Sequence, residues 1–248
     1  MLNLIRSDLY KVFHMKSFYV CGILCVLMSI INTIGMGKEA VIPFSDIIGL
    51  AGSPLLTLLL TIFSAFFVVA EYKRGYIKNI AGNIPDKAML VISKLTINAV
   101  VMLIYFAIIF ISGFVFNEIS YKISYADFTA EQYVYQALTL LFLNFAVAAL
   151  VTMISVGVQG NSGASVSMAV VISGGFLAET IWMIVTILQV AEIINPDFDI
   201  TKYFAITYIN MFSQGYSSES VDIALIIGGI YIVLSTVLSI LHIKKKDI

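Results

Sequence analysis

The stretch that decides the fold is QYVYQALTLLFLNFAVAALVTMISVGVQGNSGASVSMAVVISGGFLA, residues 132–178, which contains no Asp, Glu, Lys or Arg. A helix that crosses a membrane needs about 20 mostly apolar residues, so this stretch is long enough for two such helices. We expect the turn between them at residues 159–163, QGNSG, because Gly, Asn and Ser favour turns. The second helix then continues through Glu179 to about residue 188.

The whole chain shares this apolar character. Of its 248 residues, 60% are hydrophobic and 12% are charged, and the mean hydropathy is +1.00. A soluble domain carries about 25% charged residues, so this composition excludes a disordered chain and argues against a soluble enzyme. The net charge of -1 gives no reason to expect a nucleic-acid partner. Cys21 and Cys25 lie in one apolar run, which indicates neither a disulfide framework nor a zinc site.

Four further stretches without Asp, Glu, Lys or Arg are each long enough for one membrane helix. We therefore predict an all-α polytopic membrane protein in which residues 1–248 form a single transmembrane domain. The six predicted spans cover residues 17–36, 47–70, 95–116, 135–158, 164–188 and 222–243.

The distribution of cations predicts the orientation of these spans. With six spans both termini lie on one side, and all but three of the 14 Lys and Arg residues fall on that side. Because cytoplasmic loops are enriched in Lys and Arg, this predicts cytoplasmic termini in a multi-pass plasma-membrane protein. Residues 71–94 then form a cytoplasmic loop, whereas the longest loops, 117–134 and 189–221, are external.

The sequence contains no motif for catalysis or nucleotide binding. The Gly37 and Lys38 pair is not followed by Ser or Thr, and Asn32 stands where a phosphate-binding loop would have its first Gly. His14 and His242 have no Glu at helical spacing, which argues against a membrane metalloprotease. We therefore expect no enzymatic activity, cofactor or metal of this chain by itself.

Residues 1–16, MLNLIRSDLYKVFHMK, show a helical pattern of their own. The apolar residues at helical spacing are Leu2, Ile5, Leu9, Val12 and Phe13. The charged residues, which fall mostly elsewhere, are Arg6, Asp8, Lys11 and Lys16. This pattern indicates an amphipathic helix that lies in the cytoplasmic membrane interface. The alternative is a positively charged start that only orients the first span.

A second informative segment, EYKRGYIKN, covers residues 71–79 directly after the second predicted span. The rule that cytoplasmic loops are basic explains its three cations, Lys73, Arg74 and Lys78. That rule does not explain why Glu71 ends the span, or why an aromatic–Gly–aromatic order follows.

This segment resembles the E-[YF]-x-x-G-[TY]-[IL]-[KR]-N signature in permease subunits of type-two ATP-binding-cassette (ABC) exporters. The matching residues are Glu71, Tyr72, Gly75, Ile77, Lys78 and Asn79, whereas Tyr76 stands where many relatives have Thr. The chain length, the six-span layout and the interfacial N-terminal helix are similar to that family as well.

The resemblance implies a short cytoplasmic coupling helix at residues 71–79 that docks on a separate ATPase subunit. That partner would form a dimer and bind ATP and Mg²⁺, and a second permease copy or a paralogue would complete the complex. A physical reason supports the same interpretation: Lys73, Arg74 and Lys78 can pair with acids on a partner, and Gly75 permits a tight turn.

The resemblance also implies a substrate class. Small permeases of this kind resemble those that protect Gram-positive bacteria from lantibiotics or bacitracin-like peptides, or that export cytolytic amphipathic peptides. By this analogy the chain would move peptides or small hydrophobic compounds out of the cell or the membrane.

Two features of the fifth predicted span stand apart from the signature. Glu179 is an ionisable residue inside the span, which is costly, so it is a candidate substrate or intramembrane polar site. The alternative is an interfacial Glu179 that begins an external re-entrant segment. Small residues recur every four positions in two registers, one through Gly163 and Ser167 and one through Ser165 and Ala169, which favours close helix packing.

Two other functional classes compete with the permease. An ion-coupled secondary transporter or channel would need charged groups near the membrane midplane and inverted repeats, and Glu179 alone fits the first requirement. A membrane scaffold or sensor that transports nothing would leave the signature at residues 71–79 unexplained. Dependence on a co-expressed ATPase separates the permease from both alternatives.

Overall fold

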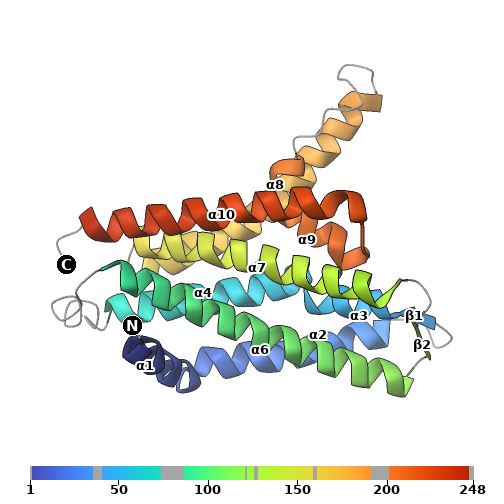
Figure 1. Ribbon diagram of the computed structural model, residues 1–248, viewed down its shortest axis with the longest axis horizontal. Helices are drawn as coiled ribbons and strands as arrows, with labels where there is room; N and C mark the ends of the chain where they lie inside the picture. The colour runs from blue at the N-terminus through green and yellow to red at the C-terminus, as the bar shows by residue number, and fades with distance from the viewer. Residues whose placement is uncertain are drawn as a thin grey trace.

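The computed structural model describes residues 2–35, 41–73, 87–120, 122–125, 128–158, 161–190 and 201–245. Long helices run side by side in a bundle, as Figure 1 shows. In chain order the elements are α1 (Leu2–Phe13), α2 (Lys16–Gly35), β1 (Val41–Pro43), α3 (Phe44–Ala51), α4 (Pro54–Lys73), α6 (Ala88–Ser120), β2 (Lys122–Ser124), α7 (Ala130–Val158), α8 (Asn161–Val190), the 3-10 helix η1 (Thr201–Tyr203), α9 (Ala205–Gln214) and α10 (Ser218–Lys245).

The helices confirm an all-α membrane protein. Among the described residues, 5 helical stretches are long and apolar enough to cross a membrane: Lys16–Ile34, Phe44–Ala70, Ala88–Ser120, Ala130–Val158 and Ser218–Lys245. The remaining predicted span, residues 164–188, falls within α8, which is 30 residues long. A sixth crossing and the side on which the termini lie stay predictions.

Several element boundaries differ from the expected ones. The predicted loop at residues 71–94 is shorter, because α6 already begins at Ala88. The span predicted for residues 47–70 is divided between α3 and α4, and Pro54 is the first residue of α4. Proline suits a first helical position because its missing N–H would be unpaired there in any case. A Cβ on Gly52, at the break, would lie 2.6 Å from Cβ of Leu140, so glycine allows α7 to approach this junction closely.

The two ends of the bundle are formed by different elements. At one end, here called the α1 end, lie α1 and the C-terminal end of α10 (Figure 1). At the other, here called the sheet end, β1 pairs in parallel with β2, with Val41 opposite Lys122. The sequence did not predict this sheet, because three-residue strands are too short to show a period of two.

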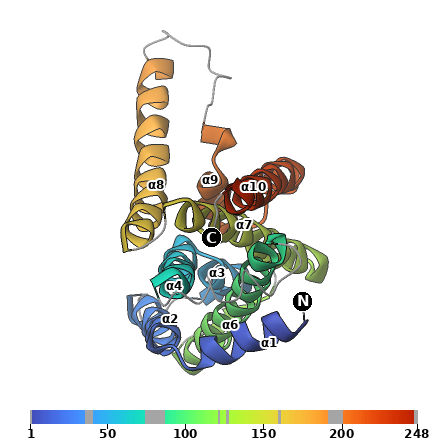
Figure 2. The same cartoon turned by 90° about the vertical axis from the view of Figure 1, so that its left-hand side faces the viewer.

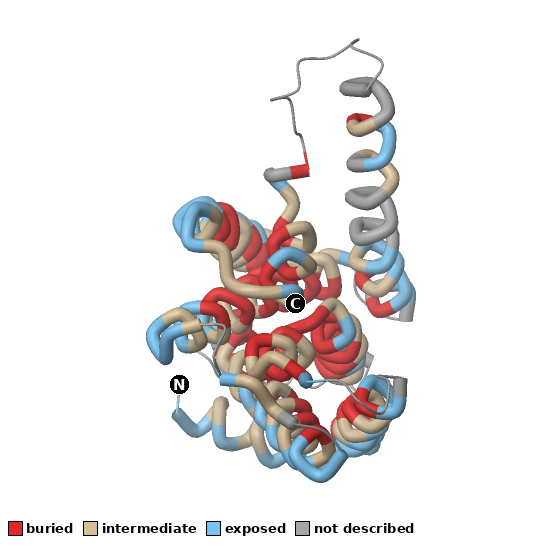
Figure 3. The backbone as a smooth tube through the Cα atoms, turned by 90° about the vertical axis from the view of Figure 1, so that its right-hand side faces the viewer, coloured by how far each residue is buried: buried red, intermediate tan, exposed pale blue. Residues whose placement is uncertain are grey.

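The α7 helix is the centre of the packing and contacts α4, α6, α8, α9 and α10. Figure 3 shows buried residues facing the interior of the bundle and exposed residues on its outside. Many of the exposed side chains are apolar, for example Ile23 and Ile31 on α2 and Ile226 and Val233 on α10. An apolar outer surface is what lipid requires of a spanning helix.

One helix leaves this bundle. The N-terminal part of α8 packs against α4 and α7, whereas its C-terminal part extends away from the other helices (Figures 1 and 2). The chain returns to the bundle through η1, which contacts α8 and α9, and α9 then packs beside α7 and α10.

Candidate functional site

A buried ion cluster lies at the α1 end. The carboxylate of Asp8 on α1 is 0% exposed and pairs with Lys94 on α6, whose Nζ lies 2.8 Å from Asp8 Oδ2. The hydroxyl of Ser93 donates to the same oxygen at 2.7 Å, and Lys11 Nζ lies 3.1 Å from Oδ1. The ammonium of Lys94 also lies 4.5 Å from the centroid of the Phe67 ring on α4. One cluster therefore joins α1, α4 and α6.

The cluster keeps Asp8 ionised. Burial has the largest single influence and raises the pKa of this carboxyl, but the attraction of Lys94, the hydrogen bonds from Lys94 and Ser93, and the charge of Lys11 together outweigh it. The pKa of Asp8 therefore lies below its ordinary value. Removing one partner of a buried ion pair destabilises the protein, because the other charge then stays buried without its compensating partner.

The cluster flanks the segment that carries the signature. Phe67 precedes the end of α4 at Lys73, and Lys94 follows the start of α6 at Ala88. Of the signature, Glu71, Tyr72 and Lys73 form the last residues of α4, and their side chains are not described. The rest of it, Arg74, Gly75, Tyr76, Ile77, Lys78 and Asn79, lies outside the described residues.

The structure divides the predicted apolar face of α1. Val12 is buried, and Ile5 and Leu9 pack against the core that α2, α4 and α6 form. Leu2 and Phe13 are exposed beside the exposed Arg6. The helix therefore presents one apolar edge to the protein and a second edge, with a cation, to its surroundings, which is compatible with a place in the membrane interface.

Polar side chains link the helices in the interior of the bundle. The amide of Asn98 on α6 accepts from Ser64 on α4 at 3.0 Å and donates to Thr152 on α7 at 2.9 Å. Closer to the sheet end, the hydroxyl of Thr57 donates to Asn144 Oδ1 at 2.6 Å, and Asn144 Nδ2 donates to the carbonyl of Gly52 at 2.9 Å. These residues are all buried, so each bond joins helices in a place that water does not reach.

The α8 helix joins this arrangement through one of its two small-residue registers. The hydroxyl of Ser167 lies 2.8 Å from that of Ser155 on α7, and both side chains are buried. Ser165 and Ala169, in the other register, are exposed. Glu179 lies further along α8, and its side chain is not among those described.

Sequence reasoning missed most of these interior groups. It counted Lys94 as a loop cation and Asp8 as a residue of the polar face. Asn144 lies near the middle of an apolar span and Asn98 near the start of another, and a polar residue inside a span is itself a signal, but only Glu179 was singled out on that ground. Within the part of the chain that the structure describes, no group of three His, Cys, Asp or Glu side chains could hold a metal ion.

The buried ion pair and hydrogen bonds can hold these helices in a fixed relation to one another. Comparison with models of protein families and with curated protein sequences gives no significant match.

Proposed function

We propose that this chain is the permease subunit of a type-two ABC exporter that is driven by a separate ATPase subunit. The observation that carries the proposal is the Asp8 cluster, which holds α1, α4 and α6 together on both sides of residues 71–79. An element that receives force from a partner needs a rigid support. A buried, hydrogen-bonded ion pair provides such support, because it holds the helices that it joins in one relative orientation.

The proposed path of movement starts at the segment between α4 and α6. A displacement of residues 71–79 would act on both helices, because the segment begins in the last turn of α4 and the chain continues from it to Ala88, where α6 begins. Lys94 would carry α1 with them through Asp8, and Asn98 would carry α7 through Thr152. ATP and Mg²⁺ belong to the partner ATPase in this scheme, and this chain contributes the docking segment and the moving helices.

In this scheme each permease chain has six spans, with the α1 end facing the cytoplasm. Two permease chains, identical or paralogous, would face each other above an ATPase dimer in the plasma membrane of a Gram-positive bacterium. The substrate class is an antimicrobial or amphipathic peptide, or a small hydrophobic compound. Glu179 stays a candidate contact for a cationic substrate.

The test is co-purification with the ATPase encoded beside this chain. The two would be co-expressed and the complex isolated from detergent through a tag on the permease. We expect Arg74→Ala with Lys78→Ala to weaken recovery of the ATPase strongly. Lys244→Ala with Lys245→Ala is the matched control, since it also removes two cations, in this case from the C-terminal end of α10. Equal losses in the two variants would reduce the role of the segment to bulk charge.

A failure to co-purify any ATPase would overturn the proposal and favour the ion-coupled transporter. Asp8 and Lys94 are the buried charged side chains among the described residues, and they neutralise each other. Ion coupling would therefore rest on Glu179, and Glu179→Gln would be tested for loss of proton- or sodium-dependent uptake in vesicles.

A further inference from the structure

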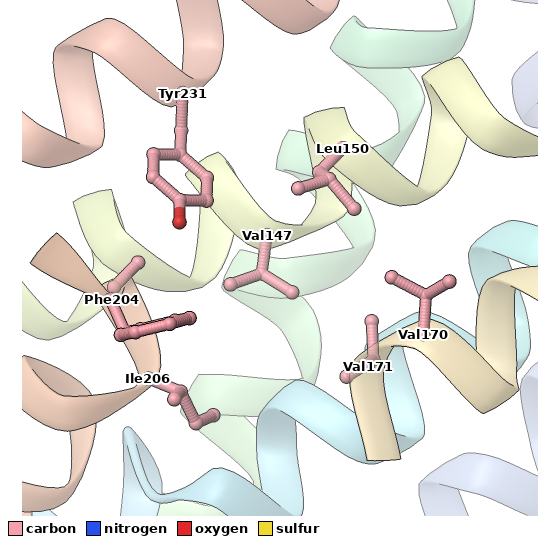
Figure 4. A pocket seen from close by; sticks show the side chains of 8 residues that line it. Val147, Leu150, Val170, Val171, Phe204, Ile206 and Tyr231 are labelled. Atoms are coloured by element: carbon pink, nitrogen blue, oxygen red, sulfur yellow. The ribbon is translucent and has the colours of Figure 1, made fainter. Parts of the chain in front are cut away.

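A pocket with a volume of about 180 Å³ lies between α7, α8, α9 and α10, away from the Asp8 cluster. The side chains that define its shape are Val147, Leu150, Val170, Val171, Phe204 and Tyr231. In Figure 4 the two α8 valines stand opposite Phe204 and Tyr231, with the α7 residues between them. From this geometry we infer that the pocket binds one hydrocarbon chain of a membrane lipid.

The chemistry of the lining selects an occupant without polar groups. Of the described residues that line the pocket, Tyr231 alone has a polar side-chain atom, and its hydroxyl donates to the carbonyl of Tyr203 at 3.5 Å. A peptide segment would bring N–H and C=O groups that this lining leaves without partners. A lipid headgroup or a charged ligand would meet the same obstacle, whereas an acyl chain needs no hydrogen bond.

The position of the pocket gives lipid access to it. Tyr231 lies at the middle of α10, a helix long enough to cross a membrane, so the pocket lies at the depth of acyl chains rather than headgroups. Val170 is 41% exposed, so the α8 wall of the pocket reaches the outer surface. On α10, Ile230, the neighbour of Tyr231, is also exposed.

The size of the pocket fits part of a chain. Apolar cavities of about 150 Å³ in proteins stay dry and accept benzene, so a slightly larger pocket holds a short run of methylene groups. The bound hydrocarbon chain would lie between the N-terminal part of α8 and the start of α9. Both elements line the pocket. This site is independent of the proposed transport function.

The test uses a phospholipid with a photoreactive diazirine on its acyl chain, in vesicles that hold the purified full chain. Cross-linked residues are mapped by mass spectrometry after proteolysis. We expect labelling of the pocket residues to exceed that of the exposed Val233 on α10 several-fold. Equal labelling of the pocket and of outward faces would mean ordinary surrounding lipid and would overturn the inference.

Two variants on neighbouring positions of α8 sharpen this test. Val171→Phe would fill the pocket and remove its labelling, whereas Ile172→Phe adds the same ring at a position that is 58% exposed and does not line the pocket. We expect the second variant to be labelled like the wild type. Retained labelling of the pocket in a well-folded Val171→Phe variant would contradict the assignment.

Wild-type measurements keep the inference testable if Val171→Phe does not fold. The same photoreactive chain on phosphatidylcholine and on phosphatidylglycerol should label the pocket equally, because the described lining carries no charge. A strong headgroup preference would contradict an acyl-chain site. Labelling of the pocket by a photoreactive amphipathic peptide in place of the lipid would reassign it to substrate.

Discussion

The two ends of the bundle are closed by different chemistry. At the α1 end, Asp8 and Lys94 form a buried ion pair that joins residues 86 positions apart. At the sheet end, Phe44 is surrounded by aromatic rings, among them Tyr133 at 5.0 Å and Tyr125 at 5.3 Å between ring centroids. The ion pair requires one fixed geometry and depends on the protonation state of its two groups. Aromatic packing tolerates several ring geometries and does not depend on pH.

Hydrogen bonds at the two ends follow the same contrast. Gln136 on α7 donates to the carbonyls of Ser45 at 3.2 Å and Phe212 at 2.8 Å, so the sheet end is held partly through backbone groups of α3 and α9. At the α1 end the bonds of the Asp8 cluster run between side chains, so both partners must keep their identity. The end next to residues 71–79 therefore depends on a specific pair of charged residues, whereas the sheet end does not.

The largest expected effect comes from breaking the ion pair. Lys94→Met leaves the buried Asp8 carboxylate with Lys11 as its remaining cation, and we expect a loss of about 3–5 kcal/mol in the free energy of unfolding. The measurement is reversible unfolding of the purified protein in mixed micelles. Asp8→Leu combined with Lys94→Met should recover most of that loss, because apolar residues replace both charges. A double variant as unstable as the single one would show that the charge pair is not the cause.

A smaller effect is expected at the sheet end. A Cβ on Gly49 would overlap the carbonyl oxygen of Ser213, so Gly49→Ala must separate α3 from α9, with an expected loss of about 1–3 kcal/mol in stability. Gly229→Ala is the control, because no atom lies within 4 Å of the added carbon. Thermal unfolding of both variants would distinguish them. A Gly49→Ala variant as stable as the control would show that the helices do not approach so closely.

Next in size is the polar link in the interior. Asn98→Ala removes the bonds to Ser64 and Thr152, and hydrogen bonds between membrane helices contribute about 0.6 kcal/mol on average, so we expect a loss of about 1 kcal/mol. Thr96→Ala is the control on the same helix, since its hydroxyl donates to the carbonyl of Ile92 within that helix. Double-mutant cycles with Thr152 would measure the coupling, and a value near zero would remove Asn98 from the proposed path.

The smallest effect is a pH dependence confined to the α1 end. The pKa of Asp8 is lowered in the folded protein, so its stabilising contribution is complete above the unfolded value of about 3.9 and is lost as the pH falls through the folded value. Spin labels at the exposed Tyr10 and Ile92 would report the separation of α1 and α6. We expect this distance to widen in acid while a label pair on α3 and α9 stays unchanged. Asp8→Asn should remove the pH dependence, and a transition that persists in it belongs to another group.

Much of the helical framework could be predicted from composition alone. The described helical stretches that are long and apolar enough to span a membrane each overlap most of one predicted span. This succeeds because a membrane helix satisfies its own backbone hydrogen bonds, so its signal is local. The exact ends were less predictable: α6 begins before its apolar stretch, since Lys94 is neutralised by Asp8 and need not end the helix.

The candidate site was predictable only in part. The signature at residues 71–79 could be recognised from nine consecutive positions, but residues 74–79 lie outside the described residues and its role stays a prediction. The partners of Asp8 could not be predicted from neighbouring positions in the sequence. A helical wheel places Asp8 beside Val12, yet nothing local identifies Lys94 as the cation that meets it.

Composition alone therefore indicates a helical membrane protein, because the length of an apolar stretch is a local property of the sequence. The packing of the helices is needed to show which polar residues face inward, how α3 separates from α4, and where α7, α8, α9 and α10 leave a pocket. These features depend on contacts between distant segments. A polar or small residue looks the same in the sequence whether its side chain contacts another helix or faces lipid. Only the packing of the helices distinguishes these two positions.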